Sequence, residues 1–153
     1  MQNFRLISEF QTIHRRPFEL ADPTILDPTN VRPLVEGEFL QLDTSYKMAR
    51  GGDNDAGTLD PAAVPSYCYF AERGRYETQA IQKGPFLYMG SYEADTLIFD
   101  GTGLTLGEAL AVVDVDIGGI VRRGLGQWAS GIVVGYVTKL PANNNNYLRF
   151  MRA

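Results

Sequence analysis

The 153-residue sequence contains one cysteine and one histidine, and this scarcity excludes several kinds of site. A single cysteine cannot form a disulfide within the chain, and Cys68 stands in an aromatic run where a small buried side chain is expected. A zinc site is excluded because His14 and Cys68 cannot supply four nitrogen or sulfur ligands. Two arginines follow His14, so we expect a surface histidine and not the base of a catalytic triad.

Long apolar runs and basic clusters are scarce as well. No segment approaches the roughly 20 consecutive apolar residues that span a bilayer, so no membrane partner is expected. The formal net charge is −4, and acidic residues outnumber basic ones between positions 35 and 100. Because an acidic surface repels phosphate, nucleic acid is not an expected partner either.

Glycine and proline, by contrast, are abundant, with 16 and 8 residues that recur at short intervals. This punctuation is typical of many short strands and unfavourable for long helices. Candidate strands lie at 38–43 with a partner at 46–49, at 66–71, at 117–121 and at 132–137. The sequence therefore predicts a mainly β protein in which residues 35–153 form a small antiparallel β-barrel or sandwich.

Residues 1–34 have a different pattern, which predicts an extended N-terminal arm ahead of this domain. Prolines at 17, 23, 28 and 33 break any helix across the segment and are poorly tolerated in a central strand. The unit Asp-Pro-Thr occurs twice, and its Asp and Thr side chains can cap local turns. Positions 4–14 of the arm could form a short helix, as could part of 58–64 in the domain. Because the arm keeps many large apolar residues, we expect it to lie on its own domain or, as we favour, on a neighbouring subunit.

Two groups of acidic residues match functional sites only in part. The loop that begins at Asp53 lacks the glycine at position six and the glutamate at position twelve of an EF-hand, which leaves only a looser divalent-ion site open. Asp114 and Asp116 share one face of a strand, as paired catalytic carboxylates do, but Val113 and Val115 occupy the opposite phase. We therefore expect both acids in water. We expect no catalytic residue, cofactor or metal, and a protein that is not an enzyme.

Five short segments, at 37–40, 92–95, 106–110, 135–141 and 147–150, resemble the small structural proteins encoded beside major capsid genes in tailed bacteriophages. These are the head decoration, or cement, proteins, and the resemblance leaves the arm outside it. It implies a β-rich domain with an N-terminal arm, bound at symmetric sites on the capsid exterior as a trimer or sometimes a dimer. The expected partners are the major capsid protein and further copies of the chain, and the expected location is the virion, after assembly in the host cytoplasm.

The arm and the loop at 122–128 are the expected contact surfaces. An extended apolar arm can pair with an exposed strand edge of a neighbour, and tryptophan and arginine dominate interface hot spots. For Trp128 an ordinary place in the core is the alternative. The expected capsid or subunit contact residues are Phe4, Leu6, Ile7, Phe10, Phe18, Ile25, Leu26, Arg122, Arg123 and Trp128.

Two other functions compete with the cement role. Another virion part, such as a tail, baseplate or head-fibre component, would have a similar build. A small ligand-binding barrel or barrel enzyme would instead line a cavity with Tyr67, Tyr69, Phe70 and Tyr88. Period-two alternation places Tyr67 and Tyr69 on one face of a strand and Cys68 and Phe70 on the other.

Overall fold

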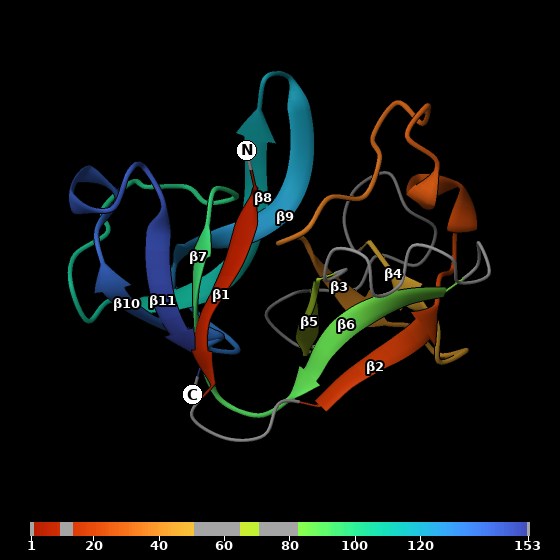
Figure 1. Ribbon diagram of the computed structural model, residues 1–153, viewed down its shortest axis with the longest axis horizontal. Helices are drawn as coiled ribbons and strands as arrows, with labels where there is room; N and C mark the ends of the chain where they lie inside the picture. Colours follow the sequence, from red (N-terminus) through yellow and green to blue (C-terminus); the bar gives the residue numbers. More distant parts are fainter. Residues whose placement is uncertain (1, 10–13, 51–64, 71–82, 153) are drawn as a thin grey trace.

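The computed structural model describes residues 2–9, 14–50, 65–70 and 83–152, and the chain is mainly β (Figure 1). Its strands form two antiparallel sheets that are not closed into a barrel. The prediction of a mainly β, antiparallel protein is therefore confirmed, and the barrel alternative is wrong. Two 3₁₀ turns complete the described elements, η1 (Pro23–Leu26) and η2 (Pro141–Asn143).

The six-stranded sheet begins with the first strand of the chain at one edge and ends with a long hairpin at the other. Its order is β1 (Phe4–Glu9), β7 (Tyr92–Thr96), β11 (Leu148–Arg152), β10 (Gly135–Lys139), β8 (Ala109–Ile117) and β9 (Ile120–Gln127). The β8–β9 hairpin turns at Gly118 and Gly119, whose φ angles of 63° and 85° are those of a type I′ turn. The predicted strand at 117–121 is therefore wrong in detail, because this turn lies in its middle.

The five-stranded sheet has a second N-terminal strand at its edge. Its order is β2 (His14–Glu19), β6 (Lys83–Met89), β5 (Ser66–Tyr69), β3 (Phe39–Leu42) and β4 (Met48–Ala49). The predicted pairing of a strand near 38–43 with one near 46–49 is confirmed by β3 and β4. Sheet pairing covers only part of 132–137, because β10 begins at Gly135.

Alternation along the strands of the five-stranded sheet buries both of its faces. Phe39, Cys68 and Leu87 belong to a core that also contains side chains of the six-stranded sheet. Their neighbours Leu40 and Phe86 lie in a second core, which is closed by apolar residues of the segment around η1. The predicted alternation in β5 is confirmed, since Tyr67 and Tyr69 pack against the second core.

The described part of the N-terminal segment lies on the chain's own sheets, which is one of the two positions expected for the arm. β1 pairs with β7, and β2 pairs with β6, so residues 4–9 and 14–19 supply an edge strand to each sheet. The short helix suggested for 4–14 is wrong, because Phe4 and Leu6 point into the core while Arg5 points outward, which is the period of a strand. Pro17 is tolerated because β2 is an edge strand with one partner.

Candidate functional site: a groove between two projections

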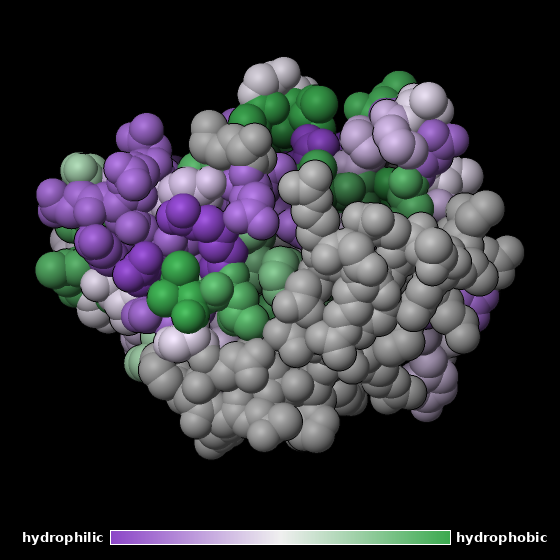
Figure 2. Space-filling view, viewed as in Figure 1, coloured by the Kyte–Doolittle hydropathy of each residue, from purple (hydrophilic) through white to green (hydrophobic). Residues whose placement is uncertain are grey.

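A groove of about 500 Å³ opens between the tip of the β8–β9 hairpin and the segment that joins η1 to β3. Figure 1 shows that the hairpin and this segment project on the same side of the molecule. In Figure 2, patches of apolar surface lie on both projections beside hydrophilic surface. The groove is lined by Asp22, Ile25, Asn30, Val31, Arg32, Arg50, Gly119, Ile120 and Val121.

The segment after η1 is held by side chains that cap its turns. Asp22 accepts a hydrogen bond from the backbone N–H of Thr24 at 3.1 Å, and Asp27 accepts one from Thr29 at 2.9 Å. The two Asp-Pro-Thr units therefore form the local caps that the sequence predicts. Asn30 then links the turns, because its Nδ2 donates to the carbonyl of Thr24 while its Oδ1 accepts from the N–H of Arg32.

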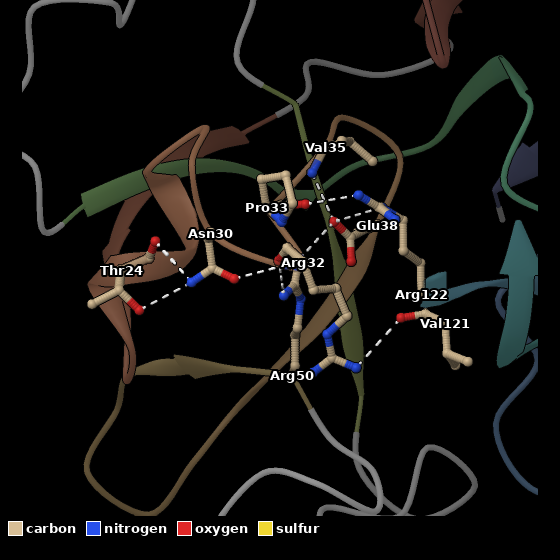
Figure 3. A network of polar contacts seen from close by, with 9 residues as sticks. All are labelled: Thr24, Asn30, Arg32, Pro33, Val35, Glu38, Arg50, Val121 and Arg122. Carbon is tan, nitrogen blue, oxygen red and sulfur yellow. Dashed lines mark hydrogen bonds and ion pairs between the residues drawn. The ribbon is translucent and has the colours of Figure 1, made fainter. Parts of the chain in front are cut away.

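A buried ionic network lies beneath this segment (Figure 3). Glu38, directly before β3, places Oε2 at 3.1 Å from Nη2 of Arg50 and at 3.7 Å from Nε of Arg122. The same oxygen accepts a hydrogen bond from the N–H of Val35 at 2.7 Å. Three distant parts of the chain thus meet at one carboxylate.

Both arginines of the network also hold the backbone that forms one wall of the groove. Arg50 donates from Nη1 to the carbonyl of Arg32, and Arg122 donates from Nη2 to the carbonyl of Pro33 at 3.0 Å. Their side chains are only 5% and 9% exposed, so these bonds are shielded from water. The wall is therefore fixed in position before any partner arrives.

The network carries more positive than negative charge. Burial raises the pKa of Glu38 even though Arg50 and Arg122 both favour its charged form. Burial also lowers the pKa of Arg50, and repulsion from Arg32 and Arg122 acts in the same direction. Two guanidinium groups thus share one carboxylate, and Arg32 adds a further positive charge near Arg50.

Apolar side chains are displayed at both tips of the groove. Val31 is 93% exposed on the capped segment, and Ile117 and Val121 are partly exposed on the hairpin. Among the described residues that line the groove, none is a serine, cysteine or histidine that could act as a nucleophile with its base. The chemistry this surface supports is binding, through apolar contact and through guanidinium donors that suit a carboxylate.

The structure corrects the expected contact role of three N-terminal residues. Phe4, Phe18 and Ile25 are buried in the chain's own cores, with Phe4 completely inaccessible, so they have no surface left for a partner. Leu6 and Leu26 are partly buried against the same cores, whereas Ile7 is exposed. Phe10 lies outside the described residues.

The three expected contact residues of the 122–128 loop lie on or just after β9 and are not brought together. Arg122 is in the buried network, and Arg123 pairs with Asp114 at 3.1 Å. Trp128 is 40% exposed, so it is not an ordinary core aromatic, and its Nε1 donates to the carbonyl of Gly131 at 3.1 Å. A contact role for Arg123 and Trp128 stays a prediction, whereas Arg122 is buried against Glu38 of its own chain.

Sequence reasoning missed the central residues of the groove. Val31, Arg32 and Arg50 carried no periodic or motif signal, because each acts through neighbours that are distant in the chain. The one available signal was local: the two Asp-Pro-Thr turns fix the segment that ends in an isolated apolar Val31. An apolar residue that follows such capped turns can be predicted from the sequence to be a contact residue.

Other suggested sites have simpler structural settings. The loop that begins at Asp53 lies outside the described residues. Asp114 and Asp116 are exposed as expected, and Asp116 accepts a hydrogen bond from the N–H of Gly119 in the hairpin turn. In the described parts of the chain, no three His, Cys, Asp or Glu side chains converge on a possible metal position. The groove is not lined by Tyr67 or Tyr69.

Cys68 is fully buried in the core that both sheets share, and burial raises the pKa of its thiol. The expected small buried side chain is therefore confirmed. No helix within the ranges that the structure describes has the length and apolar character to cross a membrane. Comparison of the chain with known protein families, characterised proteins and solved structures found no match.

Proposed function

We propose that this protein is a structural component of a bacteriophage virion, which binds the capsid exterior and bridges neighbouring subunits of the major capsid protein. The observation that carries the proposal is the display of apolar side chains on two projections beside a groove that Arg32 and Arg50 line. The resemblance of the sequence to cement proteins, in the five short segments between positions 37 and 150, also supports the proposal.

The rigidity of the projecting segment favours a role in binding. The side chain of Val31 is 93% exposed, so it buries almost no apolar surface in the isolated chain. Its segment is nevertheless ordered by turn caps and by the buried bonds from Arg50 and Arg122. A contact residue that is held in place loses less conformational entropy when a partner binds, so this arrangement suits an interface hot spot.

A second apolar surface lies at the far end of β9 and supports a bridging role. Ala109 is paired with Tyr136 and accepts a backbone hydrogen bond from Trp128, so the two exposed aromatic residues flank it. Val133, in the loop between them in sequence, is also exposed. Two separated contact surfaces allow one protein to hold two neighbours, and copies arranged by symmetry would add avidity.

Co-sedimentation with emptied phage heads that lack the protein tests this proposal. The purified chain is expected to sediment with the heads and to raise the temperature at which they disintegrate. The Trp128→Ser variant should bind more weakly, because it removes the larger aromatic side chain of the second surface. Leu106→Ser, which alters a more exposed apolar residue that belongs to neither surface, is the matched control. A protein that stays in the supernatant, or that sediments only with tails, would overturn the proposal.

A further inference from the structure

We propose that the outer edge of β8, formed by residues 112–116 on the side away from β9, binds an extended basic segment of a partner protein. In this segment, lysine or arginine alternates with apolar residues. This contact goes beyond the proposed function, because it gives the chain a further kind of partner that can be identified without a capsid. It is carried by the backbone groups of β8, by the two aspartates on this edge and by the apolar residues that alternate with them.

The backbone of β8 points away from β9 at every second residue. The carbonyl of Leu110 accepts a hydrogen bond from the N–H of Val134 at 2.8 Å, so the backbone groups of Leu110 face β10. From Leu110 onward, β8 pairs with β9 without a shift in register. Because the direction alternates along an antiparallel strand, the N–H and C=O groups of Val112, Asp114 and Asp116 face the same way as those of Leu110.

β10 covers only the first part of this side of β8. Its pairing with β8 joins Tyr136 to Ala109 and Gly135 to Leu110 and goes no further. In the described part of the chain, no backbone group bonds to the outward N–H and C=O groups of residues 112, 114 and 116. The end of the hairpin also projects from its sheet (Figure 1). The outer edge of β8 therefore presents donors and acceptors that an added strand can take up.

Two other strand edges are partly closed by the chain itself. On β9, Leu125 donates its N–H to the carbonyl of Ile98 and accepts a hydrogen bond from the N–H of Asp100. On β2, Pro17 has no N–H to offer to an added strand. Residues 112–116 contain no proline, so each outward residue of the outer edge of β8 keeps both its donor and its acceptor.

The charge on the outer edge of β8 selects a basic partner. Asp114 and Asp116 are exposed and lie on the same face of the strand. Oδ1 of Asp114 is 3.1 Å from Nε of Arg123, and Oδ1 of Asp116 accepts a hydrogen bond from the N–H of Gly119 at 2.9 Å. Among the described residues, no group bonds to the second oxygen of either acid. A lysine or arginine directly opposite on an added strand would form a favourable cross-strand pair.

The opposite face of β8 is apolar and sets the spacing of the partner segment. Val115 is buried, Val113 is partly buried, and Ile117 beside the hairpin turn is 44% exposed. Side chains of an added strand alternate between the two faces in the same way. Its apolar residues would thus extend this face, while its basic residues meet the aspartates. The segment that fits is therefore extended, with basic and apolar residues at alternate positions.

A second copy of β8 is a poor occupant of the same edge. Antiparallel pairing of two copies centred on Asp114 or on Val115 sets aspartates directly opposite aspartates, which is unfavourable. Pairing centred on Val113 instead meets the part of the strand that β10 already covers. Charge complementarity therefore favours a different, basic chain.

Selection from an immobilised library of random decapeptides tests the inference with the full-length protein. Enriched peptides are expected to alternate lysine or arginine with valine, isoleucine or phenylalanine. Fluorescence anisotropy of the best peptide should show about tenfold weaker binding when glutamate replaces its central basic residue, because like charges then face each other. Enrichment of acidic or uncharged peptides, or no enrichment at all, would overturn the inference and leave the aspartates only the role of keeping strands apart.

Methylation of the peptide backbone distinguishes strand addition from simple charge attraction. In an added strand, the N–H groups point toward β8 at every second residue. N-methyl groups at those residues should weaken binding at least about tenfold, whereas the same groups at the intervening residues should change it less than about twofold. Equal effects of the two sets would overturn strand addition.

Variants of the protein place the peptide on the outer edge of β8. Asp116→Asn should weaken binding of the best peptide about fivefold, because it removes one charge of the edge. Asp100→Asn is the matched control, since Asp100 is also exposed and accepts a backbone hydrogen bond in a turn, from Thr102 at 3.0 Å. It should change binding less than about twofold. Equal losses in the two variants would refute the outer edge of β8 as the site.

Charge reversal and sedimentation velocity complete the test. In the Asp116→Lys variant, the peptide with the central glutamate should bind better than the parent peptide, because the cross-strand pair is restored with opposite signs. A variant that keeps the original preference would contradict the contact at Asp116. Peptide binding that Val31→Ser weakens as much as Asp116→Asn would place the peptide in the groove and overturn the outer edge. Self-association that Asp116→Asn alters would make a second copy the occupant and overturn the basic partner.

Discussion

Asp95 on β7 and Glu38 directly before β3 are both buried carboxylates with two arginines as partners, yet their pKa values move in opposite directions. Burial by itself would raise both. For Asp95, hydrogen bonds from Arg149, Asn144 and Arg5 outweigh burial, and the pKa is lowered. For Glu38, burial prevails and the pKa is raised.

The two sites differ in how completely each carboxylate is hydrogen-bonded and in how far its arginine partners are exposed to water. Asp95 accepts from Arg5 at 2.7 Å, from Arg149 at 2.8 and 3.2 Å, and from Asn144 at 2.9 Å. The side chains of Arg5 and Arg149 are 36% and 25% exposed, so water still solvates part of each cation. Bonded in this way, Asp95 joins β1, β7 and β11, and its hydrogen bonds outweigh the cost of its desolvation.

The Glu38 carboxylate is hydrogen-bonded less completely than that of Asp95, and its arginine partners are less exposed to water. Its Oε2 takes all three contacts, from Val35, Arg50 and Arg122, while Oε1 is buried and accepts no hydrogen bond. Both of its arginines are almost fully buried. Such a network contributes weakly to stability for its size, and it is the network that fixes the wall of the proposed binding groove. The first carboxylate therefore serves the fold, whereas the second shapes a surface.

Replacing Glu38 by glutamine should have the largest effect. Two buried guanidinium groups would lose the carboxylate that they share, and the expected loss in the free energy of unfolding is about 3 to 5 kcal/mol. Urea denaturation measures it. Glu19→Gln is the matched control, because Glu19 pairs with Lys47 on the surface at 3.5 Å and should cost under about 1 kcal/mol. Equal losses in the two variants would show that burial of the arginines does not set the cost.

Asp95→Asn should be less damaging than Glu38→Gln. The asparagine keeps one oxygen as an acceptor, and water can solvate the released parts of Arg5 and Arg149. The expected loss is about 1 to 3 kcal/mol in the same urea experiment. If Asp95→Asn cost more than Glu38→Gln, the exposure of the arginines would not be what separates the two sites.

Neither carboxylate could be assigned its role from the sequence, although much of the fold could. The pairing of β3 with β4 and the alternation of Tyr67 and Cys68 followed from local pattern, because neighbouring residues decide them. The strand β1 was missed because its alternation of Phe4, Arg5 and Leu6 is short and precedes a proline-rich segment. Its partner β7 lies almost ninety positions along the chain, a pairing that no local signal specifies.

The groove could not be predicted from the sequence for the same reason. Glu38, Arg50 and Arg122 come from separate elements and meet only when the sheets and the hairpin have formed. Arg122 was selected from its sequence as an exposed contact residue, but the fold buries it. Residue type indicated an interaction there, and only the tertiary arrangement showed that the partner is Glu38 within the same chain.

The pH dependence of stability should show the two sites with opposite signs. Because the folded pKa of Asp95 is lowered, its stabilisation is present above the ordinary value of about 3.9 and is lost as the pH falls below it. Because the folded pKa of Glu38 is raised, its contribution falls as the pH rises above about 4.3. Each slope is at most about 1.4 kcal/mol per pH unit. Urea denaturation across pH should lose the acid-side slope in Asp95→Asn and the opposite slope in Glu38→Gln; unchanged slopes would contradict the assignment.

The smallest expected effect distinguishes the two arginines that hold Asp95. Arg149 makes two hydrogen bonds to it and Arg5 makes one, while Arg5 also stacks on the ring of Tyr147 at 4.0 Å. Double-mutant cycles with Asp95→Asn remove the stacking contribution and isolate each pair. The coupling free energy should be about 1 to 2 kcal/mol for Arg149 and under about 1 kcal/mol for the more exposed Arg5. A larger coupling for Arg5 would mean that the N-terminal strand, and not β11, is the main support of the buried carboxylate.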